Sequence, residues 1–384
     1  MTDPLLRWNP RFLTAVDTPP DAPLLLRLEA LAPDEAAALR RAAAAVWARL
    51  VLGPHGALVA GTHQQQAALA RRLAGGPEPG AALGRALAAT LAHQYGAPPP
   101  TRLGEHTWTW GRRTYVMGIL NLSPESFAGD AVPDVAAAVA RAREFAAAGA
   151  DLLDVGGEST RPGAPPVPAE VELARVLPVL QALREAVALP LSIDTYKARV
   201  AEAALAAGAC VVNDVTGLRA DLDLAAVAAA HGAALIVTHN RPAAAARGAL
   251  GSYHPHVAYT DLLGEVLREL RAAVAQAEAA GVAPTQILVD PGIGFGKTRE
   301  QNLELLARLG ELRALGRPLV LGTSRKSVIG LTLNLPVDQR VEGTAATVAL
   351  GVRAGADVVR VHDVRSMALV TRLADAIVRG AAGE

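Results

Sequence analysis

Polar side chains that could bind a substrate end several short apolar runs between residues 114 and 362. Four of them come from separate runs: Asp194 in LSIDT, Asn213 in CVVND, Asp290 in ILVDPG and Lys326 in LVLGTSRK. Two carboxylates, an amide and an ammonium supply both hydrogen-bond donors and acceptors. A flat heterocycle with amino, ring N–H and carbonyl groups needs such a mixture. These residues therefore predict a heterocycle pocket.

A second group predicts an anion site. It contains Arg161 in GGESTRPGA, Arg360 and His362 in VVRVHD, and Asn121 at the end of YVMGILN. Guanidinium groups bind phosphate oxygens bidentately. The amide oxygen of Asn121 suits Mg²⁺, which takes few protein ligands besides substrate phosphates. The alternative is that Arg360 pairs with Asp363 at the surface.

Other motifs are weaker. The segment GIGFGKT resembles a phosphate loop, but Pro291 stands where that loop needs glycine, so we predict a turn after a strand whose glycines let the backbone pass close to a bound ring. Ser324 lies outside any G-x-S-x-G elbow, and no Cys or His cluster has zinc spacing. Asp194 and Asp290 could serve glycoside hydrolysis, but a neighbouring Lys and Asn fit a polar ring better.

The runs that carry these residues have strand composition. Eight of them, near residues 115–120, 151–155, 190–194, 210–213, 233–238, 286–290, 318–321 and 357–361, alternate with helical patterns. Continuous apolar strands separated by helices predict a parallel sheet covered by helices. Eight units with polar C-terminal ends favour a TIM (β/α)8 barrel with its site at one mouth, and a doubly wound open sheet is the alternative. Closure of the barrel would bring Asn121 beside Arg360 and His362.

Residues 1–105 differ from the rest. Helical patterns at 33–50 and 64–74 enclose the apolar run GALVAG, and the APPP stretch at 97–100 is a plausible linker. We predict a small α/β N-terminal domain of unknown role over 1–105, and the barrel over 106–384. The chain of 384 residues is long enough for both.

Composition narrows the class of protein. Lys plus Arg equals Asp plus Glu at 37 each, so net charge favours neither nucleic acid nor a membrane surface as partner. Cys210 is the only cysteine, no secretory signal is visible, and no apolar run approaches the roughly 20 residues of a membrane span. We expect a cytoplasmic protein.

At these residues the sequence resembles the dihydropteroate synthases. The matching segments occur in the family's order and span roughly residues 114–380: MGILNLSPESF (117–127), GADLLDVGGESTRPGA (149–164), PLSIDT (190–195), VVNDVTG (211–217), ILVDPGIGFGKT (287–298), GTSRKS (322–327), VEGTAAT (341–347) and RVHDV (360–364). Residues 1–105 fall outside the resemblance, because most bacterial members lack such a segment.

The resemblance implies an enzyme that joins p-aminobenzoate to 6-hydroxymethyl-7,8-dihydropterin diphosphate and releases diphosphate, usually as a homodimer. It implies dissociative chemistry in which diphosphate leaves before the arylamine attacks. By matching motif, the pterin would contact Asp194, Asn213, Asp290 and Lys326. Mg²⁺ would bind Asn121, and diphosphate would bind Arg161, Arg360 and His362. The p-aminobenzoate would lie near Thr160, Phe295 and Ser324. We expect Asp194, Asp290, Lys326 and Arg161 to act on the reacting groups.

One segment departs from the family. Thr238-His239-Asn240 stands where the family commonly has Met-His-Met, so a methionine that packs against the pterin is replaced. Two alternatives remain at this point. One is a methyltetrahydrofolate-dependent corrinoid methyltransferase, against which the anion group argues. The other is a non-catalytic pterin-binding scaffold.

Overall fold

The structure is a computed structural model that describes residues 6–8, 24–53, 56–123, 131–159, 166–241 and 257–380. The chain divides into two compact units, and each is described by itself. One contains Met1–Pro98 with Arg308–Gly316, and the other contains Pro99–Ala307 with Arg317–Glu384. No helix in the described part of the chain combines the length and apolar composition needed to cross a membrane.

The larger unit is built around eight parallel strands in the order β12-β11-β10-β9-β8-β7-β14-β13. A parallel bridge between Val289 and Leu319 joins the two ends of this order, so the sheet closes. The predicted TIM barrel is confirmed, and the open-sheet alternative is wrong. The strands are β7 Tyr115–Asn121, β8 Leu152–Gly156, β9 Leu191–Asp194, β10 Val211–Asp214, β11 Ala234–Thr238, β12 Ile287–Asp290, β13 Val320–Leu321 and β14 Val358–Val361.

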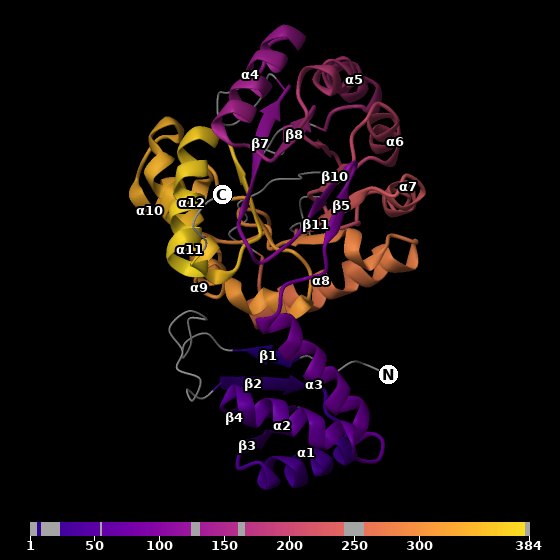
Figure 1. Ribbon diagram of the computed structural model, residues 1–384, viewed down its shortest axis with the longest axis vertical. Helices are drawn as coiled ribbons and strands as arrows, with labels where there is room; N and C mark the ends of the chain where they lie inside the picture. Colours follow the sequence, from indigo (N-terminus) through magenta and orange to yellow (C-terminus); the bar gives the residue numbers. More distant parts are fainter. Residues whose placement is uncertain are drawn as a thin grey trace. The chain divides into compact units, whose positions relative to one another are not determined.

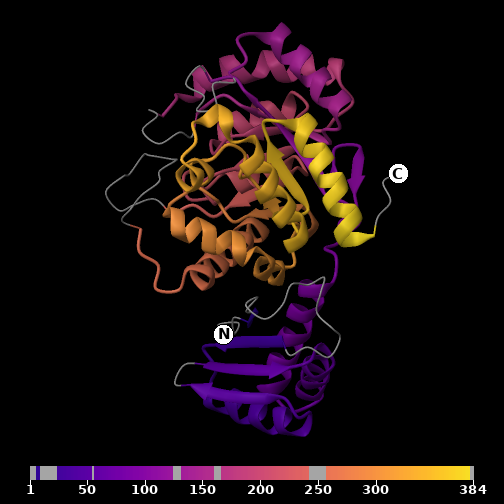
Figure 2. The ribbon, with the colours of Figure 1, turned by 90° about the vertical axis from the view of Figure 1, so that its left-hand side faces the viewer.

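Helices surround the strands (Figure 1), and the view turned by 90° shows the same enclosure (Figure 2). Local signals set helix ends: Asp134 accepts a hydrogen bond from Ala137 N at the start of α4, and Gly149 ends that helix with φ +98°. Helices α7 and α10 have seven residues each and were not predicted from the sequence. The helices are α4 Val135–Ala148, α5 Ala169–Ala186, α6 Ala198–Ala206, α7 Leu224–Ala230, α8 Leu262–Ala279, α9 Arg299–Ala307, α10 Ser327–Leu333, α11 Val341–Ala354 and α12 Val364–Arg379, with 3₁₀ turns at Pro284–Gln286 and Val337–Gln339.

An aromatic hairpin fills the end of the barrel where the strands begin. Strands β5 (Thr101–Leu103) and β6 (His106–Trp108) pair antiparallel. Trp108 stacks on Tyr115, the first residue of β7, with ring centroids 4.0 Å apart and an interplanar angle of 4°. Trp110 and Leu103 complete a buried cluster with inward-facing side chains of the strands. The opposite end, where the strands finish, therefore forms the mouth.

The smaller unit is an antiparallel sheet with helices, in the order β1-β2-β4-β3. Its core is aliphatic and includes Leu39, Val59, Leu69 and Leu87. The helix predicted over 33–50 is too long, because α1 ends at Ala45 and a strand starts at Arg49. The elements are β1 Leu6–Trp8, β2 Leu24–Glu29, α1 Pro33–Ala45, β3 Arg49–Gly53, β4 Gly56–Gly61, α2 His63–Ala74, α3 Gly80–Tyr95 and the 3₁₀ segment η3 Leu309–Leu315.

Candidate active site

Strand register brings the predicted heterocycle residues to one mouth. Successive side chains of a strand alternate between the two faces of the sheet. Asp194 pairs in register with Asn213 on β10, so their side chains share a face. Val211 and Leu288, two residues before Asn213 and Asp290 respectively, belong to the cluster inside the barrel. The same alternation therefore turns Asn213, Asp194 and Asp290 inward above an apolar layer.

Arg360 lies at the centre of this mouth. Its Nε donates to Asp154 Oδ2 and its Nη2 donates to Asp194 Oδ2, both at 2.6 Å. The amide of Asn213 donates to the same Asp154 oxygen at 3.0 Å. The surface pairing of Arg360 with Asp363 is wrong, because Asp363 instead accepts hydrogen bonds from Arg325. The sequence analysis assigned Arg360 to the anion site, but its side chain directly contacts Asp194 of the predicted heterocycle pocket.

Asp154 is a site residue that the sequence analysis missed. It lies inside β8 rather than at its end, and its side chain is fully buried. Its Oδ1 has no hydrogen-bond partner among the described residues. The available signal was a lone acidic residue within the apolar run LLDVG. A charge at such a position needs a partner, and Arg360 is that partner.

Asp290, Lys326 and Arg360 converge beside Gly322. A Cβ added to this glycine would lie 3.6 Å from Asp290 Oδ2, 3.7 Å from Lys326 Nζ and 3.9 Å from Arg360 Cβ. Lys326 Nζ also donates to Ile293 O at 2.5 Å and lies 4.5 Å from the centre of the Phe295 ring. The absence of a side chain at residue 322 therefore leaves room between a carboxylate and two cations.

Burial shifts the ionisation of these groups. It raises the pKa of Asp194, against the opposing effect of Arg360, and raises the pKa of Asp290 against that of Lys326. It lowers the pKa of Lys326 to about 8. Burial alone would lower the pKa of Arg360, but Asp154 and Asp194 raise it above its ordinary value. Arg360 is thus a permanent cation, whereas Lys326 titrates closer to neutrality.

Of the remaining predicted residues, Ser324, His362 and Asn121 lie in the described part of the chain. Ser324 Oγ accepts from His362 N at 3.1 Å and lies 2.9 Å from His362 Nδ1, so these two side chains contact each other. Asn121 Oδ1 and Asp194 Oδ2 lie 3.9 and 3.6 Å from where a Cβ of Gly156 would be. Thr160 and Arg161 lie outside the described residues.

The segment GIGFGKT forms a turn after β12, as predicted. Gly292, Gly294 and Gly296 all have positive φ, the region that favours glycine. A Cβ would lie 1.8 Å from His239 O at Gly292 and 2.1 Å from Arg241 O at Gly296. Glycine is therefore required because the turn passes close to the backbone that follows β11. The predicted close approach of these glycines to a bound ring stays a prediction.

Comparisons with known proteins identify the family of this chain. The model of the family described as pterin binding enzyme matches residues 117–362. A dihydropteroate synthase of Clostridium beijerinckii is 45% identical over 280 residues, covering 72% of this chain and 99% of that protein.

Two solved structures are also similar. The Yersinia pestis dihydropteroate synthase in a sulfonamide drug complex is 36% identical, with a TM-score of 0.69 over 74% of this chain and 100% of that one. The Xanthomonas albilineans dihydropteroate synthase with 4-aminobenzoic acid is 40% identical, with a TM-score of 0.65 over 73% of this chain and 98% of that one. The fold and the mouth define a pterin-binding barrel. More particularly, the chain belongs to the dihydropteroate synthases within the family of pterin-binding enzymes.

Proposed function

We propose that this chain condenses 6-hydroxymethyl-7,8-dihydropterin diphosphate with p-aminobenzoate to give 7,8-dihydropteroate and diphosphate, a step of folate biosynthesis. The observation that carries the proposal is the Asp154–Arg360–Asp194 bridge with Asn213 beside it, in a barrel of this family. The activity makes the protein a transferase.

The heterocycle group would hold the pterin. Asp194 and Asp290 offer acceptors to its amino and ring N–H groups, Asn213 offers both kinds of partner, and Lys326 donates to its carbonyl. Phe295, stacked near Lys326, would border the p-aminobenzoate together with Ser324 and Thr160. The contact between Ser324 and His362 supports a place for both at the boundary of the two substrates.

The residues predicted from sequence as an anion site would bind the leaving group. Arg161, Arg360 and His362 would contact the diphosphate oxygens. Among the described residues no group of three or more His, Cys, Asp or Glu side chains could hold a metal ion by itself. Asn121 Oδ1 and Asp194 Oδ2 nevertheless face the same point near Gly156, which fits Mg²⁺ bound by few protein oxygens plus substrate phosphates. When bound, the ion would neutralise charge on the diphosphate.

The chemistry we propose is dissociative. The bond between the exocyclic CH₂ and the diphosphate oxygen breaks, and the electron pair leaves with diphosphate beside Arg360 and His362. The buried carboxylates Asp194 and Asp290 stabilise the cationic pterin-methyl group that remains. The nitrogen lone pair of the arylamine then forms the C–N bond, and the amine loses a proton.

An apolar stripe on α12 supports a homodimer. Leu369, Leu373 and Ile377 follow at intervals of four residues and are 61, 65 and 72% exposed, and Leu350 on the neighbouring α11 is 65% exposed. Residues four apart lie on one helix face. Exposed leucines gathered in this way are typical of protein–protein contacts, and a second copy of the chain is the partner we propose. The cytoplasmic location and the 1–105 and 106–384 boundaries stay predictions.

The test is an assay of diphosphate release from both substrates with Mg²⁺. We expect turnover by the full chain and a loss of about 100-fold or more in kcat/KM for Asp290→Asn, because a buried ring donor would lose its acceptor. Asp223→Asn, at an exposed carboxylate, is the matched control and should behave as the parent. No release by the parent chain with any arylamine would refute the proposal.

A further inference from the structure

Only three lysines occur in the sequence, although Lys and Arg together number 37. They are Lys197, Lys297 and Lys326, and none is exposed. A guanidinium is a wide planar fork, whereas an ammonium is a compact point charge. Arginine therefore supplies nearly all basic side chains of this chain, and all three lysines are at least partly buried. Lys326 is one of the residues at the mouth of the barrel, whereas Lys297 is not among them.

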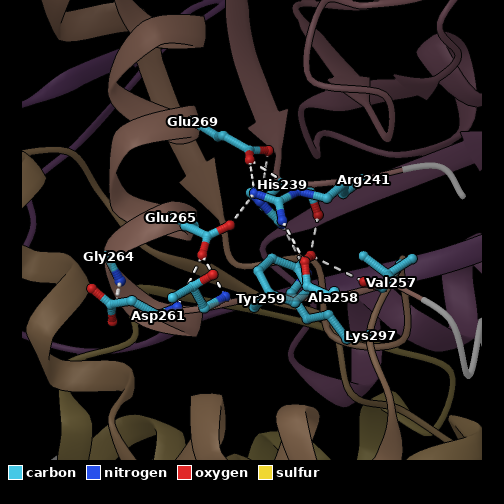
Figure 3. Close-up of polar contacts among 12 residues, drawn as sticks. His239, Arg241, Val257, Ala258, Tyr259, Asp261, Gly264, Glu265, Glu269 and Lys297 are labelled. Atoms are coloured by element: carbon cyan, nitrogen blue, oxygen red, sulfur yellow. Dashed lines mark hydrogen bonds and ion pairs between the residues drawn. The ribbon is translucent and has the colours of Figure 1, made fainter. Parts of the chain in front are cut away.

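Lys297 is fully buried and its ammonium is enclosed by acceptors. Nζ lies 2.9 Å from His239 Nδ1, 3.0 Å from Gly292 O and 3.0 Å from Phe295 O, with His239 O at 3.4 Å. Burial lowers the pKa of Lys297 to about 7, and in its ammonium form the side chain carries three protons, which match the three nearest acceptors. Figure 3 shows Lys297 and His239 in the same network as Glu269 and Arg241.

The network determines which nitrogen of His239 carries the proton. Glu269 accepts hydrogen bonds from Arg219 and Arg241, which keep it ionised, and its Oε2 lies 3.1 Å from His239 Nε2. An ionised carboxylate needs a proton on Nε2. Burial lowers the pKa of His239 to about 3, so its ring is neutral and Nδ1 accepts from Lys297.

The same carbonyls belong to the turn after β12, residues 292–296. Gly292 O and Phe295 O accept from Lys297, Ile293 O accepts from Lys326, and Gly296 O accepts from Tyr259 OH at 3.0 Å. Gly292 N in turn donates to Asp290 Oδ1 at 2.7 Å. The turn thus lies between Lys297 beneath it and the substrate mouth above it, where Phe295 faces Lys326.

We propose that Lys297, held through His239 and Glu269, is a positioning residue that fixes the 292–296 turn and thereby the place of the Phe295 ring beside the arylamine site. Only the kinetic consequence of this inference rests on the function proposed above; the structural role of Lys297 does not. It also gives a definite role to His239, in the segment where the chain departs from its family, because the His239 ring couples β11 to the turn after β12.

The direct test follows the Phe295 ring in the full chain. The sequence has four phenylalanines, so uniform labelling with 4-fluorophenylalanine gives four ¹⁹F signals, and Phe295→Leu identifies the one from residue 295. In Lys297→Met we expect this signal to broaden and move toward that of the free amino acid, while the Phe145 signal stays in place. Arg299→Met, at an exposed residue two positions away, is the matched control and should leave all four signals unchanged.

A kinetic measurement separates positioning from general damage. We expect Lys297→Met to lower kcat/KM about tenfold to 100-fold, as displaced positioning contacts do. KM for p-aminobenzoate should rise more than KM for the pterin diphosphate, because Phe295 belongs to the turn that Lys297 holds, whereas Asp290 and Lys326 lie outside this turn and each contact it through one hydrogen bond. Equal changes in both KM values, or a folded Lys297→Met with an unmoved Phe295 signal, would overturn the proposal.

A measurement on the parent chain covers the case in which Lys297→Met does not fold. Selective ¹⁵N labelling of lysine side chains gives three signals. We expect the Lys297 ammonium to show protons that exchange slowly with water, and His239 to carry its ring proton on Nε2. Rapid exchange at all three lysines would refute the proposal. A slow Lys297 signal in a chain without synthase activity would instead remove the proposed function and keep the positioning role.

Discussion

Replacement of Asp154 by Asn tests whether this buried carboxylate exists to hold Arg360. The amide can keep its oxygen at the position of Oδ2 and accept from Arg360 and Asn213. It then loses the charge that strengthens the Arg360 bond, which is worth about 1.5–3 kcal/mol. Its NH₂ group also takes the place of Oδ1, where no partner lies among the described residues, at a cost of about 1–3 kcal/mol. Their sum is about 2.5–6 kcal/mol, and relaxation of the site favours the lower half of that range.

The measurement is a double-mutant cycle with Arg360→Met, using urea unfolding of the barrel and kcat/KM for diphosphate release. In the parent background Asp154→Asn should destabilise the protein. In the Arg360→Met background the sign should reverse, or the effect should vanish, because the substitution then removes an unpaired buried charge. Glu144→Gln, at an exposed carboxylate on α4, should be neutral in both backgrounds. Equal destabilisation by Asp154→Asn in both backgrounds would refute the reasoning.

Three further predictions concern separate parts of the barrel. Burial lowers the pKa of Lys326 from 10.5 to about 8, so between these pH values the unfolded chain binds the proton and the folded chain does not. The free energy of unfolding of the parent should therefore rise with pH over this window, relative to that of Lys326→Met. A parallel pH dependence of the two proteins would contradict the shift. Leu373→Glu should convert a dimer into a monomer in sedimentation equilibrium. Leu222→Glu, at a residue that is 73% exposed but away from α12, should not. An unchanged mass of Leu373→Glu would exclude the α12 face as the dimer interface. Burial raises the pKa of Cys210 to about 11, so Ellman's reagent at pH 8 should react slowly with the native chain and quickly in denaturant, and fast native reaction would show that the thiol is accessible.

Much of the barrel could be predicted because its strands are apolar runs of limited length between helical patterns. All eight predicted strands exist, each within a residue or two of the expected bounds, although β13 has only Val320–Leu321. Helices α7 and α10 of the barrel were not predicted and have seven residues each, and the 16-residue helix α3 of the smaller unit was not predicted either. In the smaller unit, the Ala-rich stretch before Arg49 favoured helix, but the chain turns at Trp47, where φ is +57°, and continues as a strand.

The candidate site was predictable where a polar residue ends a strand, because the ends of parallel strands meet in space. It was less predictable where a residue acts from within a strand or beneath the mouth. Asp154 was hidden inside an apolar run, and Lys297 was considered only as part of a phosphate-loop pattern. Their roles depend on partners distant in sequence, Arg360 for one and His239 for the other. The sequence pattern alone does not specify such pairings.

The aromatic hairpin at the end of the barrel where the strands begin has a consequence for spectroscopy. Two of the four tryptophans, Trp108 and Trp110, are buried there against Tyr115, and Trp47 is 88% exposed. Strand β7 runs from Tyr115 to Asn121, a rise of about 20 Å at about 3.3 Å per residue. The fluorescence of Trp108 and Trp110 therefore reports on the closed end of the barrel, while the reacting groups lie at the other end. A ligand or mutation at the mouth that changes the emission of these tryptophans must act through the packing along the whole length of the barrel.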